Sequence, residues 1–96
     1  MKIDASFLAK VKLSLRKTDT DRFDDQICDL IREAILDLTK TANITDFDTS
    51  NFDAMQLGAV ICYVQYKWYA DEKYLVMYND HKAKMAISSR YSDYEE

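Results

Sequence analysis

A chain of 96 residues that is 48% hydrophobic is long enough for one domain with a small core. It has one glycine and no proline, the residues that the tight turns of β architectures need, so we expect an all-α fold. The net charge of −4 argues against a protein whose task is to grip nucleic acid, because such proteins carry a basic stripe. No signal-peptide core is visible at the N-terminus, and we expect a cytosolic protein.

The first predicted helix spans residues 4–16, with Asp4 or Ser6 as its N-cap. Phe7, Leu8, Val11 and Leu15 give it one apolar stripe. It is also the most basic part of the chain, through Lys10, Lys12, Arg16 and Lys17. These cations fit either a solvated face near a helix C-terminus or a contact with an acidic partner or DNA phosphate.

The second predicted helix spans residues 21–42, after a polar break in which Thr20 or Asp21 supplies the cap. It has the clearest helical periodicity in the sequence. The residues of its stripe are Phe23, Ile27, Leu30, Ile31, Ala34, Ile35, Leu38 and Ala42. Four charged residues lie off the stripe and are expected to face water, namely Arg32, Glu33, Asp37 and Lys40.

A non-periodic loop over residues 43–50 follows, from which Ile44 and Phe47 are expected to contact the core. The third predicted helix spans residues 52–70, with Asn51 as its N-cap and Asp53 in its first turn. This helix is apolar almost all round, so it must be covered on more than one side. Gln65 and Lys67 interrupt it, and it is too short for a bilayer span. Gly58 suggests that another helix approaches closely there.

The third helix carries a cluster of large aromatic residues, Tyr63, Tyr66, Trp68 and Tyr69. Core packing explains part of the cluster, and four such groups cannot all point into one small core. Tyrosine and tryptophan are also enriched where proteins bind one another. The cluster is therefore a candidate interface as well as a candidate part of the core.

The fourth predicted helix spans residues 72–88, with Tyr74, Tyr78, His81 and Met85 as its stripe. The prediction is an all-α bundle of three antiparallel core helices plus a short N-terminal helix. Residues 1–89 form a single domain and residues 90–96 a flexible C-terminal tail. Arg90, Tyr91 and Tyr94 make this tail a second candidate interface, with a solvated end as the alternative.

No catalytic, cofactor or metal site is predicted. The acidic loops that begin at Asp19 and Asp46 resemble the opening of a calcium loop, but both lack the glycine at position six and the glutamate at position twelve. His81 is the only histidine and fits a packed core residue. Cys28 and Cys62 have no nucleophile partner in sequence and fit two thiols better than a disulfide.

Three stretches of the sequence resemble the head–tail connector proteins of tailed bacteriophages, also called head-completion or DNA-packaging adaptor proteins. They are Leu15 to Ala34, Phe52 to Lys67 with its Tyr-Val-x-x-Lys ending, and Asp71 to Ser89. Together they cover most of the chain in the family's order. The sequence departs from the family pattern at Ala54, where a proline is common, and at Gly58.

The resemblance implies a structural, non-enzymatic subunit of a phage or prophage. It implies a homo-oligomeric ring of about twelve copies beneath the portal protein, which extends the channel for double-stranded DNA without sequence-specific binding. The ring would dock a stopper or tail-completion protein, so the location would be the virion neck and, during assembly, the bacterial host cytoplasm.

Two other functions remain open on the sequence. One is a small helical DNA-binding regulator, although the third helix carries a single lysine and a recognition helix is normally basic. The other is a protein-interaction module such as an antitoxin or adaptor.

Overall fold

The computed structural model describes residues 2–41 and 47–94, and for residues 88–94 it describes the backbone alone. This part of the chain forms four helices, α1 (Ala5–Ser14), α2 (Asp24–Thr41), α3 (Ala54–Tyr69) and α4 (Glu72–Tyr94). The all-α prediction is confirmed. Within the described residues, no helix combines the length and the apolar character needed to cross a membrane.

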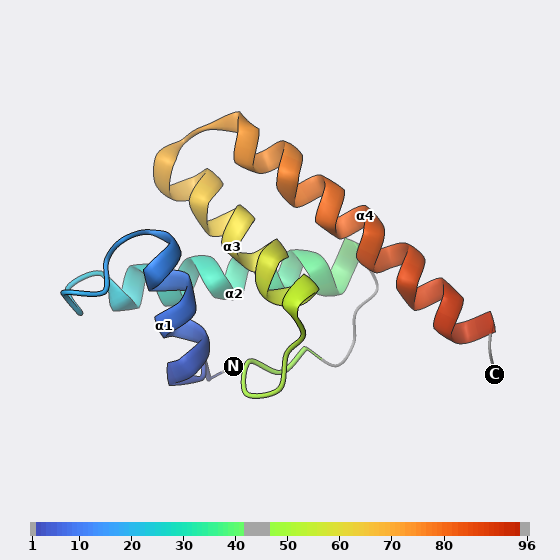
Figure 1. The fold of residues 1–96 in the computed structure, drawn as a ribbon, viewed down its shortest axis with the longest axis horizontal. Helices are drawn as coiled ribbons and strands as arrows, with labels where there is room; N and C mark the ends of the chain where they lie inside the picture. Colours follow the sequence, from blue (N-terminus) through green and yellow to red (C-terminus); the bar gives the residue numbers. More distant parts are fainter. Residues whose placement is uncertain (1, 42–46, 95–96) are drawn as a thin grey trace.

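Helix α3 is the centre of the arrangement and contacts the three other helices. Figure 1 shows α2 crossing behind α3, while α3 and α4 run in opposite directions from the turn that joins them. Helix α4 lies along one edge of the molecule and diverges from the rest towards its C-terminus. The molecule is elongated, with principal extents of 45 × 28 × 18 Å.

Asp4, one of the two predicted caps, is the N-cap of α1, and its carboxylate accepts the Ser6 backbone N–H. The chain that leads into α1 is also held in place. The buried hydroxyl of Thr49 accepts the Asp4 backbone N–H at 2.8 Å and donates to the Lys2 carbonyl at 3.3 Å. Thr49 thereby joins the start of the chain to the loop that precedes α3.

The predicted starts of α2 and α3 are both too early. Helix α2 begins at Asp24, because residues 21–23 form a turn in which Thr20 accepts the Arg22 backbone N–H. Asp53, not Asn51, is the N-cap of α3. Asp53 accepts the Gln56 backbone N–H, and the Gln56 side chain accepts the Asp53 N–H, so the two residues form a capping box. Asn51 could not form one, because the residue three positions later is Ala54.

The turn between α3 and α4 is short. Ala70 ends α3 in the left-handed conformation, with φ of 53°, and Glu72 already belongs to α4. Helix α4 then continues to Tyr94, six residues beyond its predicted end at residue 88. Residues 90–94, assigned to a tail from the sequence, are therefore helical, while residues 95–96 lie outside the described part of the chain.

The core matches the predicted stripes of α1, α2 and α4. Its fully buried members include Phe7, Val11, Ile27, Ile31 and Leu38. Phe47 packs against Phe7 as expected, with ring centroids 6.1 Å apart, while Ile44 lies outside the described residues. Phe52 makes a closer edge-to-face contact with Phe7, at 4.8 Å.

The close approach expected at Gly58 is present, and it comes from α4. A Cβ atom on Gly58 would lie 3.2 Å from Cε1 of His81, so the imidazole ring occupies the space that a larger residue would need. His81 is half-buried on the predicted stripe of α4, consistent with a packing role.

Candidate functional site

The four aromatic residues of α3 have different surroundings. Tyr63 and Trp68 are half-buried and make contacts within the chain: Trp68 meets Phe23 edge-to-face at 5.5 Å, and Tyr63 meets Tyr78 at 5.2 Å. Tyr66 is half-buried beneath the Lys67 ammonium.

Tyr69 is the most outward of the four, 45% exposed, with its ring 5.8 Å from that of Tyr74. Tyr69 is consequently the member of the cluster with the most surface left for a partner.

The three candidates from the predicted tail, Arg90, Tyr91 and Tyr94, lie on the final turns of α4. Their side chains are outside the described part of the structure, so their contacts stay a prediction.

A polar cluster joins α2 to α4. We call it the α2–α4 latch and define it as Asp37, Tyr78 and Lys82. The buried Tyr78 hydroxyl donates to Asp37 Oδ2 at 2.5 Å, and the Lys82 ammonium donates to the same oxygen at 3.2 Å. Lys82 also lies 5.1 Å from the centroid of the Tyr78 ring.

The latch fixes the charge states of its members. Partial burial alone would raise the pKa of Asp37, but the hydrogen bonds from Tyr78 and Lys82 outweigh it and hold the pKa below its ordinary value. Burial, followed by the hydrogen bond to Asp37, raises the pKa of Tyr78. The latch is therefore an ionised carboxylate held by a neutral phenol and an ammonium group.

A second phenol–carboxylate pair lies next to the latch. The Tyr63 hydroxyl donates to Glu33 Oε1 at 2.9 Å, and burial together with this bond raises the pKa of Tyr63 to about 12. The sequence prediction that Glu33 and Asp37 face only water is therefore wrong for Asp37, which is half-buried, and incomplete for Glu33, which is exposed but bonded. The available signal in the sequence was Tyr78 four residues before Lys82, which places both on one side of α4. It did not reveal which carboxylate they would bond to.

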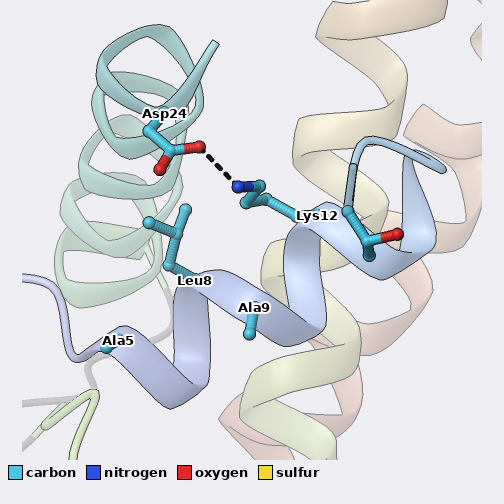
Figure 2. Close-up of a pocket in the computed structure, with 6 residues that line it drawn as sticks. Ala5, Leu8, Ala9, Lys12 and Asp24 are labelled. Carbon is cyan, nitrogen blue, oxygen red and sulfur yellow. Dashed lines mark ion pairs between the residues drawn. The ribbon is translucent and has the colours of Figure 1, made fainter. Parts of the chain in front are cut away.

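A shallow groove of about 260 Å³ lies between α1 and the start of α2. Ala5, Leu8 and Ala9 form its apolar wall, and Thr18 borders it. Figure 2 shows Lys12 reaching across from α1 to Asp24, where its ammonium lies 2.8 Å from Oδ1. This ion pair joins α1 to the start of α2.

Two of the four basic residues near α1 are thus engaged within the chain. Lys12 pairs with Asp24, and the ammonium of Lys17 lies 5.4 Å from the centre of the Phe23 ring. Lys10 and Arg16 are exposed. The basic surface available to an acidic partner or DNA phosphate is smaller than the sequence indicates.

The cysteines are free thiols, as predicted. Burial raises the pKa of Cys62, and it is also the largest cause of the raised pKa of Cys28, so the thiolate fraction of both is small near neutral pH. Among the side chains of residues 2–41 and 47–87, no group of three or more histidine, cysteine or acidic residues could hold a metal ion. Asp48 of the calcium-like loop instead accepts both the N–H and the hydroxyl of Ser50, while Asp46 lies outside the described residues.

Comparison with models of protein families, with curated proteins and with solved structures gives no match to this chain.

Proposed function

We propose that the protein is a head–tail connector subunit of a tailed bacteriophage or prophage. In this role it forms a ring of about twelve copies beneath the portal, extends the DNA channel and docks a stopper or tail-completion protein. The proposal places it in the virion neck, after assembly in the host cytoplasm.

The observation that carries the proposal is the resemblance of the three sequence stretches to that family. The fold supports it, because these stretches cover the first part of α2 and most of α3 and α4, and α3 packs against both of the other helices. The charges of the α2–α4 latch are also paired with one another, which suits a structural contact.

The surface that remains for partners supports an assembly role. Tyr69 on α3 and Val76 and Ile87 on α4 are large apolar side chains that are 45%, 68% and 52% exposed. Helix α4 carries two of them along the edge of the molecule, where neighbouring subunits could reach them (Figure 1). The alternative of a DNA-binding regulator is less well supported by the structure than by the sequence. Lys12 and Lys17, which could contact DNA phosphate, already make contacts within the chain.

Co-expression with the portal protein of the same genome tests the proposal. We expect the chain to copurify with the portal and to add a ring of density beneath it in electron micrographs. Tyr69→Ala should weaken this association, whereas Leu36→Ala, which truncates a similarly exposed residue on α2, should leave it unchanged. Monomeric behaviour of the wild-type chain in the presence of the assembled portal contradicts the proposal.

A further inference from the structure

The face of α4 that points away from α3 carries an apolar strip without a partner in the monomer. We call it the outer strip and define it as Val76, Ala83 and Ile87, all of which are exposed. Their spacing of seven and four residues places them on one side of the helix, opposite the buried Tyr78 and Met85. Figure 1 shows α4 at the edge of the molecule, with the other helices on its inner side alone.

Two opposite charges lie beside the outer strip. Asp80 and Lys84 form an ion pair along the helix, with Nζ 3.0 Å from Oδ2, and their side chains are 63% and 62% exposed. The midpoint between Asp80 and Lys84 coincides, within half a residue, with the midpoint between Val76 and Ile87. Along this face, an apolar, an acidic, a basic and an apolar residue therefore follow one another, and the two pairs share nearly the same midpoint on the helix.

We propose that α4 binds α4 of a second copy of this chain, antiparallel and around a two-fold axis through that centre. The rotation places Val76 against the partner's Ile87 and Asp80 against the partner's Lys84, and each contact occurs twice. Ala83 lies near the crossing, where a small side chain lets the two helices approach closely.

The charges of Asp80 and Lys84 favour an antiparallel pair of α4 helices over a parallel one. A parallel arrangement would bring Asp80 against Asp80 and Lys84 against Lys84, so both charge contacts would be repulsive. The antiparallel arrangement turns both into attractions without any change of sequence. Because the strip is small, we expect a dissociation constant in the micromolar range or weaker.

This pairing differs in geometry from the proposed ring, although both proposals use the exposed Val76 and Ile87. A two-fold contact uses the same surface on both copies and closes at two, whereas a ring needs two different surfaces arranged head to tail. Dimerisation of the free chain and docking to a portal are therefore measured independently, and either can fail alone.

Charge reversal gives a direct test by sedimentation equilibrium, up to about 1 mM protein. The Asp80→Lys and Lys84→Asp variants each replace two attractive contacts of the dimer by two repulsive ones. We expect each variant alone to dimerise roughly tenfold more weakly than the wild type, or worse. An equimolar mixture of the two should dimerise like the wild type, because its heterodimer restores both attractions.

The double variant Asp80→Lys/Lys84→Asp is the matched control, since it exchanges the charges and should dimerise like the wild type. Both positions are exposed, so circular dichroism should show unchanged helix content throughout. Recovery upon mixing cannot come from the ion pair within one helix, which each single variant loses permanently. A monomeric wild type, undiminished dimerisation of the single variants, or a mixture that stays as weak as its components would overturn the proposal.

Discussion

The two faces of α4 differ in where their polar and apolar groups find partners. On the inner face, Tyr78 and Lys82 bond to Asp37 of α2, and His81 covers Gly58 of α3. On the outer face, Val76 and Ile87 face solvent, and Asp80 has its partner four residues along the same helix. The contacts of the inner face lie within one chain, whereas the outer face is the surface that we propose a second copy covers.

The largest effect is expected from a buried charge in the core that the inner face covers. Ile31 is fully buried on α2, so Ile31→Asp should cost several kcal/mol and unfold a domain of this size. Leu36→Asp on the same helix is the control, because Leu36 is 56% exposed and its carboxylate would stay in water. Thermal melts followed by circular dichroism separate the two, and a wild-type melt for Ile31→Asp would contradict the core assignment.

An intermediate effect is expected from the α2–α4 latch, and it should depend on pH. The folded-state pKa of Asp37 is depressed, so its contribution is complete above the ordinary aspartate value of 3.8 and is lost as pH falls through the lower folded value. At neutral pH, Asp37→Asn should cost about 1 kcal/mol, since the carboxylate is partly exposed.

The difference between Asp37→Asn and the wild type should shrink as the solution is made more acidic. The matched change on the outer face, Asp80→Asn, removes an exposed ion pair and should lower stability by only a few tenths of a kcal/mol at neutral pH. Urea titrations at a series of pH values measure both. A difference between Asp37→Asn and the wild type that stays constant down to the acid limit would show that Asp37 is not the titrating group.

The smallest effect is expected at Gly58. Alanine would gain up to about 1 kcal/mol of helix propensity, but its Cβ would lie 3.2 Å from His81 Cε1, so Gly58→Ala should be nearly neutral. In a His81→Ala background the same change should stabilise by most of that 1 kcal/mol. A double-mutant cycle of unfolding free energies measures the coupling, and equal effects in both backgrounds would show that the imidazole does not restrict this position.

The helices and most of the core could be predicted from periodicity. A helix that is buried on one face has its apolar residues three or four positions apart, and this spacing is visible in the sequence. The stripe of α2 is the clearest case, and its central members Ile27, Ile31 and Leu38 are fully buried. The core face of α3 could not be predicted from periodicity, because this helix is apolar on almost every side. Ile61, near its middle, is only half-buried, whereas Val60 and Val64 are fully buried.

Features that depend on a second helix could not be predicted in the same way. Asp37 was assigned to solvent because it lies off the stripe of α2, and only the path of α4 brings Tyr78 and Lys82 to it. The N-cap of α3 was within reach, since Gln56 lies three residues after Asp53 and five after Asn51. The extension of α4 beyond residue 88 has a local reason, because the sequence there contains neither proline nor glycine to end the helix.

The left-handed conformation of Ala70 at the start of α4 lets this helix act as a lever. Its 23 residues span roughly 35 Å, and its direction relative to α3 is set at a joint only one or two residues long. The hydrogen bonds from Tyr78 and Lys82 to Asp37 restrain the lever about 9 Å and about 15 Å from its pivot. A tilt of about 10° at Ala70 would move Tyr78 by about 1.6 Å, enough to break its bond to Asp37, and would carry the far end of α4 through about 6 Å. Small changes near the pivot are therefore amplified at the end of the helix.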